Sequence, residues 1–103
     1  RIVVDTGMHW KGWSREKAAD YMEDTVGLAR GAVENEIDRY CVWPAQACGY
    51  KIGHLEFVRL RAEAQAKLGA RFDLRSFHDA VLKGGAMPLE VLARVVDEWV
   101  KGA

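Results

Sequence analysis

Three residues near the start of the chain have types and spacing that could do chemistry. Asp5 and His9 are four residues apart, and Arg1 lies four residues before Asp5. On a helix, this spacing places all three on one face. A carboxylate beside an imidazole can fix its tautomer and favour its protonated form, which would make His9 a hydrogen-bond donor. The alternative is an exposed row of charged side chains worth roughly 0.3 kcal/mol per pair.

A second group of candidate residues surrounds the proline in RYCVWPAQACGYKIG, residues 39–53. Glycines flank Tyr50, and a glycine lets a ligand or a backbone segment approach closely. A phenol near a reacting carbonyl can donate a hydrogen bond to the developing oxyanion, so Tyr50 is a candidate electrophile. The alternative is that these aromatic residues belong to the core and its boundary. The polar and aromatic residues of the segment are Tyr40, Trp43, Gln46, Tyr50 and Lys51.

The remaining chemical residue types do not form a known motif. His9, His54 and His78 are scattered, and there is no His-Glu-x-x-His, Cys-x-x-Cys or Asp-rich loop. There is also no phosphate loop and no Gly-x-Ser-x-Gly elbow. The sequence therefore predicts no metal site within these residues.

The two cysteines, Cys41 and Cys48, are predicted to be free. Seven residues of helix separate their Cα atoms by about 10 Å, and a disulfide needs a separation below about 7 Å. We expect two buried thiols in a reducing compartment, which favours the cytoplasm.

Composition excludes several classes of partner. The 103 residues carry 15 basic and 15 acidic side chains, with a formal net charge of zero. Such a chain builds no strong positive field for nucleic acid or for an anionic membrane. No apolar stretch approaches the roughly 18–20 residues that span a bilayer. We expect one small soluble domain that binds neither nucleic acid nor membrane, or part of a larger domain.

The hydrophobic periodicity is helical almost throughout, which predicts an all-α fold of about six helices. Ser14 and Asp73 are expected N-caps, Gly69 an expected C-cap, and Pro44 is expected in the first turn of the longest helix. The expected helices are a short one ending near residue 10, one from Ser14 to about Gly27, then 29–42, 45–68, 74–82 and 89–100.

The longest predicted helix has apolar residues on two faces. One stripe contains Ile52, Leu55 and Ala62, and the other contains Phe57, Leu60, Ala64 and Leu68. A surface helix normally has a single apolar stripe. We therefore expect partner helices outside these residues, in the rest of the same protein or in another subunit. A compact bundle around a central helix explains the pattern equally well.

Several ordered motifs together resemble the C-terminal part of the bacterial "domain of unknown function 885" family. They are VDTG-x-H, GWSRE-x-A, RY-x-x-WP-x-QA-x-GYKIG, FD-x-R-x-FHDAVL and PL-x-VL, in this order over nearly the whole chain. That family is similar in fold to the mostly helical, oligopeptidase-like zincin metallopeptidases. The resemblance implies that the zinc-binding His/Glu motif, its general-base Glu and a further Glu ligand lie upstream of these residues.

The resemblance also implies roles for residues of this chain. His9, supported by Asp5, and Tyr50 would bind the scissile carbonyl of a peptide-like substrate and stabilise the tetrahedral intermediate. Arg1, Gln46 and Lys51 would contact the substrate or orient these donors. Zinc is expected in the intact protein with its ligands elsewhere, so the isolated chain should neither hold zinc tightly nor hydrolyse a substrate.

One position departs from the family pattern. Relatives commonly have Pro-Gly-Gln-Ala before the tyrosine, whereas this chain has Pro44-Ala45-Gln46-Ala47. Alanine is tolerated in a helical turn but is costly where the backbone needs a positive φ.

Two functions follow as hypotheses. The first is the C-terminal part of a zinc-dependent peptidase-like hydrolase, which agrees with an Arg rather than a Met at position 1. Any export signal would then lie upstream. The second is a stand-alone helical module that dimerises or binds a partner through its apolar faces, without catalysis.

Overall fold

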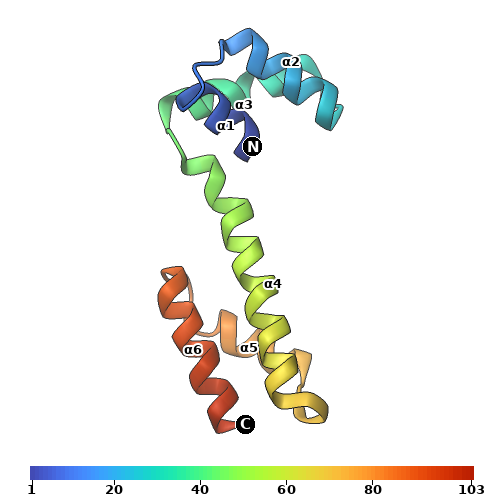
Figure 1. The fold of residues 1–103 in the computed structure, drawn as a ribbon, viewed down its shortest axis with the longest axis vertical. Helices are drawn as coiled ribbons and strands as arrows, with labels where there is room; N and C mark the ends of the chain where they lie inside the picture. Colours follow the sequence, from blue (N-terminus) through green and yellow to red (C-terminus); the bar gives the residue numbers. More distant parts are fainter. The chain divides into compact units, whose positions relative to one another are not determined.

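A computed structural model describes all residues from 1 to 103. It contains six α-helices (Figure 1), which confirms the prediction of an all-α fold. The residues form two compact units, 1–52 and 53–103, each with its own core. The prediction that the whole chain acts as one unit of a larger domain stays a prediction. The elements are α1 (Ile2–His9), α2 (Arg15–Val26), α3 (Arg30–Val42), the 3-10 turn η1 (Gln46–Cys48), α4 (Gly49–Leu68), the 3-10 turn η2 (Gly69–Arg71), α5 (Leu74–Leu82) and α6 (Leu89–Gly102).

Local capping residues begin and end several helices where the sequence predicts. The Ser14 hydroxyl accepts a hydrogen bond from the Lys17 N–H at 3.1 Å and starts α2. Gly27, with φ 75°, ends α2 in the left-handed conformation that glycine adopts without strain. The Asp73 carboxylate accepts from two N–H groups of the first turn of α5, each at 3.3 Å.

The start of the longest helix differs from the prediction. Ala45 has φ 67° and ψ −12°, which is left-handed, so neither it nor Pro44 is part of a helix. The chain instead turns at Pro44 and Ala45 and passes through η1, and α4 begins at Gly49. The prediction of Pro44 in the first helical turn is therefore wrong, because a left-handed residue interrupts the helical hydrogen-bond ladder.

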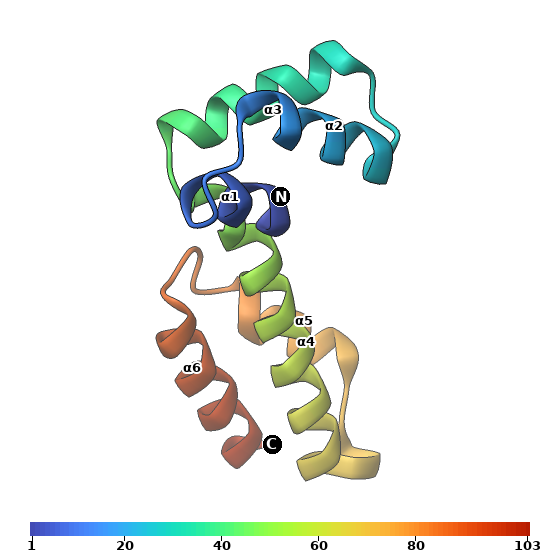
Figure 2. The same ribbon diagram turned by 45° about the horizontal axis from the view of Figure 1, so that its top comes forward.

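The first unit is built on a hairpin of α2 and α3, joined by the short connection from Gly27 to Ala29 (Figure 2). Small residues on α2 let the two helices approach closely, and α1 and η1 each add residues to the same core. The buried side chains are Val4, Ala18, Ala19, Met22, Val33, Ile37, Tyr40 and Ala47.

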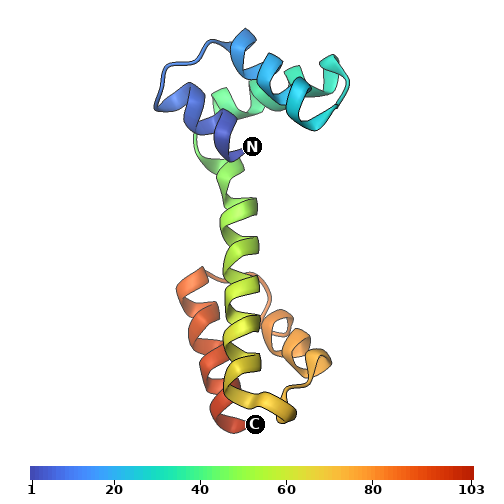
Figure 3. The ribbon, with the colours of Figure 1, turned by 45° about the vertical axis from the view of Figure 1, so that its right-hand side comes forward.

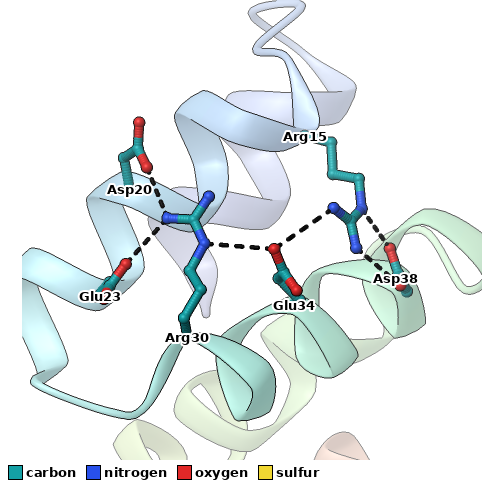
Figure 4. Close-up of polar contacts among 6 residues, drawn as sticks. All are labelled: Arg15, Asp20, Glu23, Arg30, Glu34 and Asp38. Atoms are coloured by element: carbon teal, nitrogen blue, oxygen red, sulfur yellow. Dashed lines mark hydrogen bonds and ion pairs between the residues drawn. The ribbon is translucent and has the colours of Figure 1, made fainter.

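A row of exposed ion pairs links α2 and α3 (Figure 4). Arg30 donates to Asp20 at 2.6 Å and to Glu23 at 2.9 Å, and Arg15 donates to Asp38 at 2.7 Å. Glu34 lies between the two arginines, 3.4 Å from Arg30 and 3.9 Å from Arg15. Exposed pairs contribute little individually, but this network ties both helices of the hairpin along their solvent face.

The second unit packs the C-terminal part of α4 with α5 and α6 (Figure 3). Phe72, Phe77 and Trp99 contact one another through tilted and edge-on ring pairs. The indole N–H of Trp99 donates to the Ser76 hydroxyl at 3.1 Å, which satisfies its polar atom. The core side chains are Leu60, Ala64, Phe77, Val81, Leu92 and Val96.

The two predicted apolar stripes of α4 have different environments. Leu60, Ala64 and Leu68 are buried. Ile52 and Leu55 are exposed, at 52% and 53%. The expected cover for the exposed stripe, a further part of the protein or another subunit, stays a prediction. None of the helices is long and apolar enough to span a membrane.

Candidate functional site

Asp5 is a buried carboxylate on α1, only 2% exposed. Both of its oxygens lie 3.1 Å from the backbone nitrogen of Ala45, whose N–H they accept. A buried charge requires such partners to offset its lost hydration. Asp5 therefore fixes the turn that leads into η1 and α4, where Gln46 and Tyr50 are located.

His9, one turn further along α1, has a different partner from the one predicted. Its Nε2 lies 2.9 Å from the backbone carbonyl oxygen of Tyr40. Because a carbonyl only accepts, Nε2 carries the proton in this contact. The structure shows no hydrogen bond between His9 and Asp5. The tautomer of His9 is thus set by α3 rather than by the carboxylate on its own helix.

Tyr50 lies in the first turn of α4 and is 56% exposed. The guanidinium carbon of Arg1 is 4.5 Å from the centre of its ring, and that of Arg39 is 5.9 Å away. Both distances are within the range of a cation–π interaction. The exposed phenol is thus a free hydrogen-bond donor beside two positive charges.

Glu36 joins the two guanidinium groups and was not among the residues predicted from the sequence. Its carboxylate accepts from Arg39 Nη2 at 3.1 Å and lies 3.6 Å from Arg1 Nε. The Tyr40 hydroxyl donates to the same carboxylate at 3.0 Å. Arg39 Nη1 in turn donates to the side-chain oxygen of Gln46 at 2.5 Å. The i, i+3 and i, i+4 spacing of Glu36 from Arg39 and Tyr40 is the signal that could have identified it.

The electrostatics of this cluster follow from these contacts. The hydrogen bond from Arg39 holds the pKa of Glu36 below its ordinary value, and the hydroxyl of Tyr40 acts in the same direction. Burial raises the pKa of Tyr40, and the hydrogen bond to Glu36 raises it further. Glu36 is consequently an anion and Tyr40 a neutral donor near neutral pH.

The structure brings together three of the predicted site residues, namely Arg1, Gln46 and Tyr50, and adds Glu36 and Arg39 to them. Lys51 is exposed and makes no hydrogen bond or ion pair. His9 shares no hydrogen bond with any of them. The resulting cluster can present donors and positive charge to a ligand with a partial or full negative charge.

The cysteines are both free, as expected, but only one is buried. Cys48 is buried, and that burial raises the pKa of its thiol, with a further contribution from the negative charge of Asp5. Cys41 is exposed, so the prediction of two buried thiols is wrong for this residue. Cys41 lies at the solvent side of α3 and donates only to Met8, with 3.9 Å between the sulfur atoms.

No group of three or more His, Cys, Asp or Glu side chains is placed to hold a metal ion. His54 and His78 are exposed and make no hydrogen bond or ion pair with the residues of the cluster around Tyr50. The donor set of these residues therefore does not fit a zinc ion.

Two comparisons with known proteins find a match for this chain. The chain is similar to a crystal structure described as the "putative lipoprotein" from Colwellia psychrerythraea, with 50% sequence identity and a TM-score of 0.96. The match covers 99% of this chain but 17% of that one, so the chain spans about a sixth of the neighbour's length. None of the curated proteins matches. The sequence model described as "Bacterial protein of unknown function (DUF885)" matches residues 1–96. The chain belongs to the DUF885 family.

Proposed function

We propose that these residues form part of a peptidase-like hydrolase, in which they bind the substrate and stabilise the transition state. The observation that carries the proposal is the exposed Tyr50, whose ring lies beside the guanidinium groups of Arg1 and Arg39. In many hydrolases, the largest single contribution to the rate enhancement comes from hydrogen-bond donors and positive charge that are already in place where negative charge develops in the transition state. Tyr50 would donate a hydrogen bond to the carbonyl oxygen as that oxygen becomes an oxyanion.

The other residues of the cluster have supporting roles in this proposal. Arg39 holds Gln46 and Glu36, and Asp5 fixes the turn that leads to them. His9 could donate to the substrate only through Nδ1, because its Nε2 is already bonded to the Tyr40 carbonyl. A donor role for His9 therefore requires a doubly protonated imidazole.

Zinc belongs to the proposal only as a constituent of the intact protein. No set of ligands for it exists among these residues, so none of the steps assigned here passes through the metal. The share of the similar structure that the chain covers, 17%, leaves most of such a protein to supply other groups.

The test is Tyr50→Phe in the full-length protein, assayed against a panel of blocked peptides and simple esters. Phenylalanine keeps the ring beneath Arg1 and Arg39 but removes the donor. Loss of one oxyanion donor should lower kcat by about 100-fold or more, with KM changed little. The metal content of the protein should stay the same, because no metal ligand is altered.

Tyr21→Phe is the matched control. Tyr21 is also partly exposed and contacts an aromatic ring, that of Trp13, but lies on α2 outside the cluster. Its substitution should leave kcat unchanged. Unaltered turnover in the Tyr50→Phe protein would remove Tyr50 from the mechanism.

A second candidate function is a helical interaction module, favoured by the exposure of apolar residues on α4. Leu55 and Val58 lie one turn apart and are both about half exposed. Serine at both positions discriminates the two functions in the full-length protein. A module would lose self-association or partner binding and keep its stability. An enzyme whose other parts cover α4 would instead lose stability, because core contacts would be removed.

A further inference from the structure

The charges around Tyr50 are unbalanced compared with the rest of the chain. Every other arginine that forms an ion pair, namely Arg15, Arg30 and Arg59, faces at least two carboxylates. In the α2–α3 network of Figure 4, two arginines meet four carboxylates. Arg1 and Arg39 share a single one, that of Glu36. Positive charge therefore remains in excess beside an exposed phenol.

The cluster also has more unused hydrogen-bond donors than unused acceptors. The acceptors are already used within the protein, because Glu36 accepts from Tyr40 and Arg39, and the Gln46 oxygen accepts from Arg39. The donors that remain are the Tyr50 hydroxyl, the Gln46 amide N–H groups and the guanidinium edge of Arg1. A partner of this surface must supply acceptor atoms and negative charge, which is the chemistry of a carboxylate.

We propose that the cluster of Arg1, Arg39, Gln46 and Tyr50 binds a carboxylate of the substrate. This inference rests on the proposed function and specifies its substrate class as peptides that carry a carboxylate near the scissile bond. Arg1 lies 4.5 Å from the ring centre of Tyr50. A carboxylate on Arg1 would therefore place the neighbouring carbonyl of the same peptide close to the phenol. The carboxylate is supplied either by the C-terminus of the peptide or by an acidic side chain.

Glu36 sets the strength of this binding. As the one carboxylate between the two arginines, it attenuates the positive potential that an incoming anion meets. Removing its charge while keeping its shape should therefore strengthen binding of the anion. Removing the charge of Arg39 should weaken it. Both substitutions break the same Arg39–Glu36 ion pair. If that pair had a purely structural role, both substitutions would change the affinity for the anion in the same direction.

The experiment measures binding of three probes to the full-length protein by calorimetry. The probes are acetyl-dialanine with a free carboxylate, the same peptide as its C-terminal amide, and an amidated acetyl-glutamyl-alanine. We expect Glu36→Gln to tighten binding of the carboxylate probe roughly threefold, and Arg39→Gln to weaken it about tenfold. Binding should fall as salt rises. Arg94→Gln is the control, because Arg94 is exposed on α6 and forms no ion pair.

The three probes distinguish the source of the carboxylate. Preference for the free acid over both amides identifies a C-terminal carboxylate, and preference for the glutamyl amide over the dialanine amide identifies an acidic side chain. Equal binding of all three probes overturns the inference, as does weakening in both variants. Because binding is measured without turnover, absence of hydrolysis would contradict the proposed function alone. The carboxylate site is tested separately, by whether the affinity for the carboxylate probe rises in Glu36→Gln and falls in Arg39→Gln.

Discussion

Asp5 and Ala45 are forty residues apart and are joined by both oxygens of a buried carboxylate, each 3.1 Å from the Ala45 nitrogen. Ala45 is also the one non-glycine residue of the chain with a positive φ. The hydrogen bonds from α1 thus hold the backbone in a conformation that alanine alone disfavours. This contact connects the first helix to the turn that leads toward Gln46 and Tyr50.

Asp5→Asn should destabilise the protein by about 1–3 kcal/mol. Asparagine retains one acceptor oxygen for the Ala45 N–H but places a buried amide N–H group without a partner. The free energy of unfolding, measured by urea denaturation, checks this value. Asp24→Asn is the control, because Asp24 is exposed on α2 and makes no ion pair, and it should change stability by less than about 0.5 kcal/mol. Equal stabilities for the two variants would contradict the role assigned to the Asp5–Ala45 contact.

Ala45→Gly should stabilise the protein by roughly 0.5–1 kcal/mol. The left-handed conformation costs alanine about 1–2 kcal/mol, and the greater freedom of glycine in the unfolded chain cancels only part of that gain. Ala32→Gly is the opposite case, because Ala32 is exposed within α3, and it should destabilise by about 1 kcal/mol. Thermal unfolding of both variants gives the comparison. A loss of stability at both positions would mean that the φ of Ala45 carries no strain.

The sequence predicted most of the helices because their signals are local. The hydrogen bonds of Ser14 and Asp73 reach only two or three residues along the chain, so the residue types alone identify them. The start of α4 was mispredicted because its determinant is not local. Pro44 is compatible with a first helical turn, and only the contact with Asp5, together with the left-handed Ala45, directs the chain elsewhere.

The sequence predicted several residues of the candidate site but not the contacts between them. Arg1, Gln46 and Tyr50 were expected and do lie in one cluster. The spacing of Asp5 and His9 places both on α1, but it does not reveal that each has a partner in a later segment of the chain. Glu36 resembles any helix-surface acid in the sequence. Its role becomes visible only in the folded chain, where it pairs with both Arg1 and Arg39, the two arginines beside the Tyr50 ring.

Gly7→Ala should destabilise the protein by about 1–3 kcal/mol through overpacking. A Cβ atom at Gly7 would have three ring atoms of Trp13 within 2.9 Å, and the ring would have to move. Gly31 is also helical but has open space around it, so Gly31→Ala should stabilise by roughly 0.5–1 kcal/mol. If Trp13 packs directly on Gly7, denaturant unfolding should show changes of opposite sign in the free energy of unfolding of the two variants. A gain in stability at Gly7 would show that the ring yields without cost.

Glu36→Gln should lower stability most at neutral pH. The pKa of Glu36 is lowered in the folded protein by the hydrogen bond from Arg39 and by that from Tyr40. A lowered pKa in the folded state stabilises that state at pH values above the ordinary pKa of the group, which is 4.5 for this carboxyl. This stabilisation is lost as the pH falls from 4.5 through the lower pKa of the folded protein, because the carboxylate becomes protonated in both states.

The wild-type protein and the variant should therefore converge in stability toward low pH, as measured by urea unfolding at a series of pH values. Glu98→Gln, at an exposed position on α6 without an ion pair, should show no such convergence. A difference for Glu36→Gln that is the same at pH 7 and pH 3 would attribute its effect to packing and not to the charge between Arg1 and Arg39.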